Sequence, residues 1–113
     1  LAGGNGDDTI YGGDGYDTIN AGDGDDVMYG GYDGGDGYSD VFVFNDFNWG
    51  EYDEIRDFED GVDLIRLSGV SPSDLSFDDT EYGVEVTVGD TGHVIYVEGM
   101  DSTTLTSADF YFV

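Results

Sequence analysis

The sequence predicts an all-β fold, a flattened parallel solenoid of very short strands followed by a β-rich cap. Three observations predict it. Glycine and aspartate recur with a period of nine over residues 3–29, and each nonamer carries one large aliphatic side chain at its eighth position. From Val41 onward the composition changes to alternating β-branched and aromatic residues. We therefore expect residues 1–40 to form the solenoid repeats and residues 41–113 to form a β-rich carboxy-terminal cap.

The repeats read GGNGDDTIY from Gly3, GGDGYDTIN from Gly12 and AGDGDDVMY from Ala21. Their sixth positions are Asp8, Asp17 and Asp26, and their eighth positions are Ile10, Ile19 and Met28. A fourth copy, GGYDGGDGYSDVFVF from Gly30, contains extra residues before its aspartate, Asp40. Atypical repeats are expected where a stack meets its cap.

One large aliphatic residue in nine cannot form an amphipathic helix, which needs one every three or four residues. It suits a very short strand with one inward side chain, and the glycines suit turns that require positive φ and close backbone approach. Two nonamers then complete one coil. We therefore expect repeats n and n+2 to stack in parallel on each face.

Such turns expose backbone carbonyls beside the aspartate at position six, and stacked turns present two half-shells of oxygen ligands to each other. Calcium accepts six to eight oxygens in flexible geometry, whereas magnesium demands tighter octahedral order. We expect Ca²⁺ to be held with Asp8 paired to Asp26 on one edge and Asp17 paired to Asp40 on the other. The candidate turn ligands are Gly4, Asn5, Gly6, Gly13, Asp14, Gly15, Gly22, Asp23 and Gly24.

The charge of the chain points to the same partner. Its 27 acidic residues stand against two arginines, which gives a net charge of −25. This self-repulsion opposes compaction, so the ion-free chain is expected to be weakly stable or unfolded. Nucleic acid and anionic membrane surfaces are poor candidates as partners, since phosphate binding relies on lysine and arginine. The chain has no cysteine and no apolar run long enough to insert into a membrane.

The nonamers resemble the GGxGxDxUx repeats of the repeats-in-toxin (RTX) family, and the resemblance implies a calcium-bound parallel β-roll. The alternative is glycine-rich disorder. An EF-hand loop and a G-x-G-x-x-G loop do not fit the spacing. The segment DEIRDFEDGVDLIRLSG, residues 53–69, resembles one that follows the repeats in RTX proteins, including serralysin-type proteases. That resemblance implies a further calcium held by Asp53, Asp57 and Asp63, against the alternative of solvated loop carboxylates.

Within the cap, residues 84–88, 93–97 and 109–113 are expected to be strands, with a turn at GDTG between the first two. Val84, Val86 and Val88 are expected to share one side of the sheet. The segment SPSDL is expected to start a short helical turn capped by Ser71 or Ser73. Four aromatic residues are expected in the core rather than as sugar-stacking platforms, namely Trp49, Phe58, Tyr82 and Phe110.

The ending SADFYFV resembles the carboxy-terminal export signal of proteins that leave Gram-negative cells by type I secretion, and it also suits a closing strand. The resemblance implies a secreted, extracellular calcium-binding RTX module. It would fold on calcium outside the cell and support type I secretion and stability of a larger enzyme, toxin or adhesin. The alternative is a calcium-dependent module that binds polysaccharide or a cell surface.

No catalytic residue is expected in this chain. His93 has no cysteine partner and no G-x-S-x-G turn is present. His93, at the head of an expected strand, is interpreted as structural or solvent-facing.

Overall fold

The computed structural model describes residues 2–13, 15–30, 39–44, 51–58, 62–89, 92–101, 103, 105 and 109–113. Ten strands and one short 3₁₀ helix are found in these residues. The strands are β1 (Thr9–Tyr11), β2 (Thr18–Asn20), β3 (Val27–Tyr29), β4 (Val41–Phe44), β5 (Tyr52–Ile55), β6 (Leu64–Leu67), β7 (Leu75–Asp79), β8 (Gly83–Val88), β9 (His93–Glu98) and β10 (Phe110–Phe112), and the helix is η1 (Pro72–Asp74).

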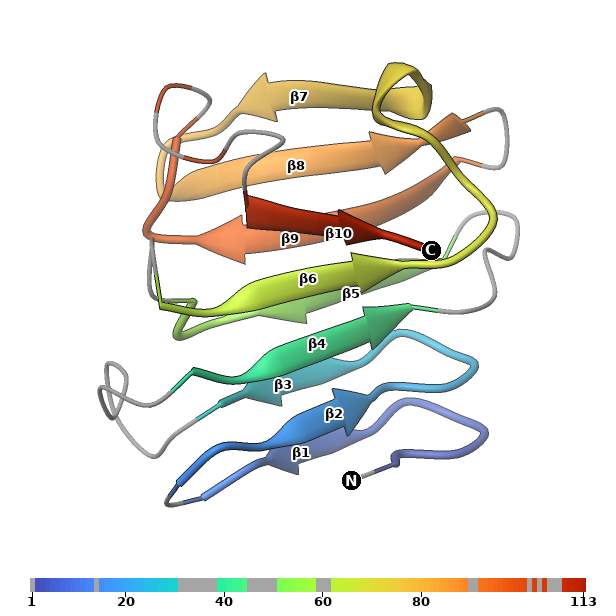
Figure 1. Cartoon of the computed structure of the whole chain (residues 1–113), viewed down its shortest axis with the longest axis vertical. Helices are drawn as coiled ribbons and strands as arrows, with labels where there is room; N and C mark the ends of the chain where they lie inside the picture. The colour runs from blue at the N-terminus through green and yellow to red at the C-terminus, as the bar shows by residue number, and fades with distance from the viewer. Residues whose placement is uncertain are drawn as a thin grey trace.

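The strands form two sheets that lie face to face, with the amino-terminal coils at the bottom in Figure 1. One sheet has six strands in the order β1-β3-β5-β9-β8-β7, and the other has four in the order β10-β6-β4-β2. Consecutive strands from β1 to β6 alternate between the two sheets. The fold is therefore an all-β roll with parallel stacking, as the sequence predicts.

The parallel pairs follow the expected repeat spacing. Strand β1 pairs with β3 through Ile10 and Met28, and β2 pairs with β4 through Ile19 and Phe42. Repeats n and n+2 thus stack, which confirms the prediction. The same parallel pairing continues beyond residue 40, because β5 pairs with β3 and β9, and β6 pairs with β4 and β10. The division of the chain at residue 40 stays a prediction.

The core lies between the two sheets and is built from the eighth position of each repeat. Ile19 and Met28 are fully buried, and Ile10 is nearly so. Each repeat contributes only one such side chain, so a single coil cannot shield it from water. Stacking buries these side chains in one continuous cluster with those of the later strands.

The last strands complete the six-stranded sheet with antiparallel pairs. Strand β8 pairs antiparallel with both β7 and β9. Val84, Val86 and Val88 are all buried on the inner face of β8, as alternation predicts. Strand β7 was not predicted. Helix η1 begins after Ser71, whose amide donates to the Asp74 carboxylate at 2.9 Å, so Ser71 rather than Ser73 is the cap.

The aromatic predictions have mixed outcomes. Phe58 and Phe110 are buried in the core, which confirms their assignment. Tyr82 is 70% exposed, so its assignment to the core is wrong. It lies in the bend between β7 and β8, outside the alternation that turns strand residues inward. Trp49 lies outside the described residues. None of the described helical segments is long and apolar enough to cross a membrane.

Candidate metal centre

The turns between the strands have the positive φ angles that the glycines were expected to allow. Six turn glycines have φ between +84° and +110°, namely Gly4, Gly6, Gly13, Gly15, Gly22 and Gly24. The turns also stack closely. The Gly4 carbonyl accepts a hydrogen bond from the Asp23 amide at 3.0 Å, so the first and third repeats are in backbone contact there.

Because of this stacking, glycines at the same position of different repeats should tolerate substitution by alanine to different extents. A Cβ at Gly22 would overlap the Gly4 carbonyl oxygen, whereas a Cβ at Gly4 would meet nothing within 4 Å. Gly4→Ala is expected to cost about 1–2 kcal/mol for positive φ alone. Gly22→Ala adds overpacking and is expected to cost about 2–5 kcal/mol. Urea unfolding in millimolar calcium measures both, and equal losses would contradict close stacking of the turns.

The position-six aspartates form a column along one edge, which we call the first edge. Asp26 Oδ1 accepts a hydrogen bond from the Asp8 amide at 2.8 Å, and Asp53 Oδ1 accepts one from the Asp26 amide at 2.9 Å. These contacts join residues 18 and 27 positions apart, which are multiples of the nine-residue period. Asp8 and Asp26 therefore lie next to each other at this edge, and their joint binding of calcium stays a prediction.

A second column lies along the opposite edge, the second edge. Asp40 Oδ1 accepts from the Asp17 amide at 2.9 Å, and Asp63 Oδ1 accepts from the Asp40 amide at 2.9 Å. Asp17 and Asp40 thus lie next to each other despite the extra residues of the fourth repeat, and their joint binding of calcium stays a prediction. Asp57 joins this edge, since its Oδ1 accepts from the Gly30 amide at 2.6 Å.

The three aspartates of the second motif do not share one site, contrary to the resemblance. Asp53 belongs to the first edge, whereas Asp57 and Asp63 belong to the second. Asp53 lies in β5 (Tyr52–Ile55), whereas Asp57 lies in the bend that follows this strand, at the opposite edge. Ligands of one calcium lie about 2.3–2.6 Å from the ion, so these two carboxylates cannot meet on it. Asp53 and Asp63 instead extend the two aspartate columns by one step each, and Asp57 accepts a hydrogen bond from Gly30 at the second edge.

Three buried oxygens test whether these columns suit a cation. Oδ2 of Asp8, Asp17 and Asp26 is buried and has no hydrogen-bond partner among the described residues. A buried carboxylate oxygen without a partner is costly. A hard divalent cation bound by carboxylate and carbonyl oxygens would satisfy it, so the residues present fit calcium.

Electrostatics support the same fit at Asp26, which is 1% exposed. The pKa of its carboxyl is raised from 3.8 to about 6, mainly by burial and to a smaller extent by the carboxylates of Asp53, Asp8 and Asp7, while the hydrogen bond from the Asp8 amide lowers it. The ion-free site therefore resists ionisation. A bound cation would reverse this effect, because an opposite charge nearby favours the carboxylate.

The first edge ends in a cluster that the sequence did not reveal. His93 Nε2 lies 2.7 Å from Asp53 Oδ2, and its Nδ1 lies 3.7 Å from Glu51 Oε2. His93 is 1% exposed, so the solvent-facing alternative is wrong, and its structural role stays a prediction. Glu51 also accepts from the Gly24 amide at 2.8 Å. Glu51 is in register with Gly24, so it stands where the repeat has a glycine. The repeat motif therefore did not identify it as a candidate ligand.

The aspartates at position five of the repeats also accept hydrogen bonds from backbone amides of the next coil. They were not among the predicted ligands. Asp7 Oδ1 accepts from the Asp25 amide at 2.8 Å, and Asp25 Oδ1 accepts from the Tyr52 amide at 2.7 Å. Among the other predicted ligands, the side chains of Asn5 and Asp23 are exposed. Asp14 lies outside the described residues.

Comparisons with known proteins agree with this arrangement. Residues 2–31 match the family model of the RTX calcium-binding nonapeptide repeat, in four copies. This part of the chain is therefore a set of RTX repeats, which bind calcium. No curated protein sequence matches the chain significantly.

A solved structure shares the fold. The AlgE6R3 subunit of the Azotobacter vinelandii mannuronan C5-epimerase matches with a TM-score of 0.67 and 18% sequence identity. The match covers 98% of this chain and 80% of that one. At this identity the likeness shows the fold, a β-roll.

Proposed function

We propose that this chain is a non-catalytic, calcium-dependent folding module of a larger extracellular protein. The observation that carries the proposal is the set of partnerless, buried Oδ2 atoms of Asp8, Asp17 and Asp26 within the described repeats. Such oxygens make the ion-free fold unfavourable, and bound calcium supplies the positive charge that they lack. In this proposal residues 1–40 carry the repeats and residues 41–113 cap them.

The proposed ligands are the two edge columns. Asp8, Asp26 and Asp53 would hold cations at the first edge, and Asp17, Asp40 and Asp63, together with Asp57, at the second. Backbone carbonyls of the glycine turns complete each shell. The columns place carboxylates at successive coils, so every site joins two coils and stabilises their stacking.

This coupling suits export as an open chain. Where calcium is scarce the net charge of −25 opposes folding, and the absence of cysteine leaves no disulfide to block threading. Extracellular calcium modules have dissociation constants of about 10⁻⁴ to 10⁻³ M, so folding would follow arrival outside the cell. We propose type I secretion from a Gram-negative bacterium as the route, with residues 109–113 as part of the signal.

Export in calcium-depleted medium tests the route, because there the folded strand cannot matter. The chain is fused behind a reporter and expressed with a type I transporter. Deletion of residues 109–113 is expected to reduce secreted reporter at least about tenfold relative to the full fusion, with equal amounts inside the cell. Tyr16→Ala serves as the control, since Tyr16 is a 76% exposed tyrosine that lies outside residues 109–113. Undiminished export of the deletion would contradict the signal and leave calcium-driven folding intact.

Binding to polysaccharide or a cell surface is the second candidate. Its support is the likeness in fold to a subunit of an enzyme named for mannuronan. The acidity of this chain disfavours direct contact with an anionic polymer, so bridging calcium would have to mediate it. A glycan array in calcium and in chelator separates the candidates, since a folding module alone binds no glycan.

A further inference from the structure

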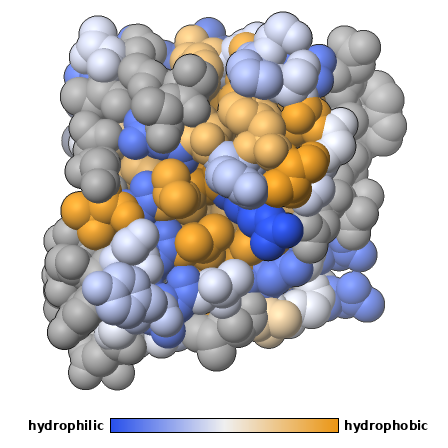
Figure 2. Space-filling view, viewed as in Figure 1, coloured by the Kyte–Doolittle hydropathy of each residue, from blue (hydrophilic) through white to orange (hydrophobic). Residues whose placement is uncertain are grey.

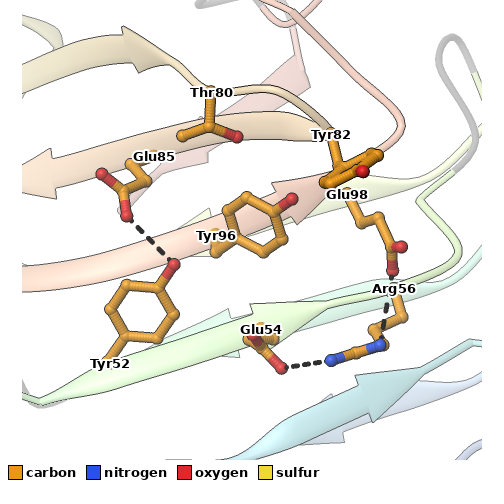
Figure 3. Close-up of a pocket in the computed structure, with 8 residues that line it drawn as sticks. All are labelled: Tyr52, Glu54, Arg56, Thr80, Tyr82, Glu85, Tyr96 and Glu98. Atoms are coloured by element: carbon orange, nitrogen blue, oxygen red, sulfur yellow. Dashed lines mark hydrogen bonds and ion pairs between the residues drawn. The ribbon is translucent and has the colours of Figure 1, made fainter.

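A groove of about 440 Å³ lies on the outer face of the six-stranded sheet. Figure 3 shows its lining, which comes from β5, β8 and β9 and from the segments that follow β5 and β7. Three tyrosines, three glutamates, one arginine and one threonine line it, namely Tyr52, Tyr82, Tyr96, Glu54, Glu85, Glu98, Arg56 and Thr80. The calcium-dependent folding proposed above uses none of them.

The tyrosines give the groove aromatic surface. The rings of Tyr52 and Tyr96 stack across β5 and β9, with centroids 6.3 Å apart and an interplanar angle of 22°. Tyr82 follows them in a diagonal line across the groove in Figure 3 and is 70% exposed. An exposed tyrosine beside two stacked ones presents ring faces to a ligand at little cost in ordering.

The charges give the groove a negative excess. Three carboxylates face one guanidinium, so the lining carries a formal charge of −2. Arg56 lies 3.0 Å from the Glu54 carboxylate and 3.8 Å from that of Glu98. The hydrogen bond to Glu54 is the main cause that raises the pKa of Arg56. The groove thus already holds one guanidinium between carboxylates.

Glu85 is the carboxylate placed to receive a second cation. Its Oε2 accepts a hydrogen bond from the Tyr52 hydroxyl at 3.0 Å, which fixes its orientation toward the groove. Arg56 makes its ion pairs with Glu54 and Glu98 instead. Glu85 therefore offers negative charge next to the ring of Tyr96.

We propose that this groove binds the guanidinium group of an arginine side chain in a basic peptide segment. The planar guanidinium stacks on tyrosine and pairs with a carboxylate in the same pose, which a compact ammonium group does less well. The charge of the groove opposes anionic ligands. This binding is a further property of the folded module and does not depend on the export route.

A second groove offers an internal control. It lies on the outer face of the four-stranded sheet, where Figure 2 shows hydrophobic side chains gathered near the middle of the view. Its volume, about 450 Å³, is nearly equal, but no acidic side chain is among the residues that line it, namely Thr18, Val41, Leu64, Arg66, Tyr111 and Val113. The second groove therefore matches the first in volume and contains one tyrosine, but it lacks the carboxylates.

The test titrates the whole chain in millimolar calcium with acetyl-Gly-Arg-Gly-amide and follows NMR chemical shifts. Saturable shifts are expected around Tyr82, Tyr96 and Glu85. The citrulline peptide, with the same shape and no charge, is expected to bind at least about tenfold more weakly, and the lysine peptide about two- to fivefold more weakly. Circular dichroism of each sample confirms the calcium-dependent fold separately.

Variants locate the binding. Tyr82→Ala is expected to weaken the arginine peptide about two- to fivefold and Glu85→Gln at least about threefold, whereas Tyr111→Ala leaves affinity unchanged. Equal binding of arginine and citrulline, equal losses for Tyr82→Ala and Tyr111→Ala, or tighter binding of a neutral oligosaccharide at Tyr82 would each overturn the proposal. Shifts confined to the edge aspartates and removed by added calcium would also overturn it.

Discussion

In a chelator the chain is expected to show the circular dichroism spectrum of a random coil, and millimolar calcium is expected to convert it to a β spectrum. The ion-free fold must bring a net charge of −25 into one compact body. It must also bury Oδ2 of Asp8, Asp17 and Asp26 without a hydrogen-bond partner in the described repeats. Each repeat adds only one side chain to the core, so burial of apolar surface does not offset these two unfavourable contributions to the free energy of folding.

The size of the effect follows from ligand linkage. A site at a hundredfold excess of calcium over its dissociation constant adds about 2.7 kcal/mol to the folded state. Small domains have only about 5–15 kcal/mol of net stability. A few occupied sites along the two edges therefore decide whether the chain folds.

Two controls separate calcium binding from charge screening. Potassium chloride at 1 M reduces the Debye length to about 3 Å without supplying a divalent ligand. Magnesium at the concentration of calcium supplies charge but demands tighter geometry and keeps its waters. Both are expected to leave most of the chain unfolded. A β spectrum that persists in chelator, or appears fully in potassium chloride, would contradict calcium-driven folding.

The nine-residue period was sufficient to predict the part of the fold that it covers. Aspartate at position six and an aliphatic residue at position eight fix which side chains lie at the edge and which lie inside. The parallel pairing of repeats n and n+2 follows from that alternation, and Ile10 opposite Met28 confirms it. The step from Asp26 to Asp53 keeps the period, since 27 is three times nine.

The later part of the stack could not be read in this way because its spacing changes. The steps from Asp17 to Asp40 and from Asp40 to Asp63 are both 23 residues, which is not a multiple of nine. The motif resemblance grouped Asp53 with its sequence neighbours, whereas the stack separates them onto two edges. His93 contacts Asp53 across 40 residues, a pairing set by β9 joining the sheet rather than by any local pattern.

The sequence also did not distinguish exposed aromatic residues from buried ones. The sequence analysis assigned Tyr82 to the core together with Phe58 and Phe110, but a tyrosine in a bend between strands does not follow the inward alternation of strand residues. Its exposure matters for the arginine groove, since that groove consists of side chains from three strands and two connecting segments. Their proximity depends on sheet order, which the local sequence does not encode.

Asp26→Asn is expected to change the stability of the fold in opposite directions with and without calcium. Asparagine keeps an oxygen to accept the Asp8 amide and removes the charge that burial and neighbouring carboxylates disfavour. Sucrose is added to populate the ion-free fold for measurement. Urea unfolding in chelator and in calcium then gives both free energies.

Without calcium, the variant is expected to be more stable than the parent at pH 7 by up to roughly 3 kcal/mol, from a carboxyl pKa raised from 3.8 to about 6. A raised folded-state pKa means that the folded chain binds the proton more tightly than the unfolded chain. The contribution of Asp26 is therefore fully present below pH 3.8 and is lost as pH rises through about 6. The stability of the ion-free parent should fall between about pH 3.8 and pH 6, and the variant should lose part of that dependence.

With calcium, the order is expected to reverse. The variant lacks the ionised oxygen that the cation requires, so it should bind fewer ions by calorimetry and lose about 2–3 kcal/mol at a hundredfold excess of calcium. Asp78→Asn is the matched control, since Asp78 is exposed on β7 and its loss removes the same formal charge far from either edge column. Equal destabilisation of Asp26→Asn in chelator and in calcium would contradict a role for the Asp26 carboxylate in calcium binding. A reversal confined to Asp26 would identify its buried Oδ2 as an oxygen that calcium satisfies.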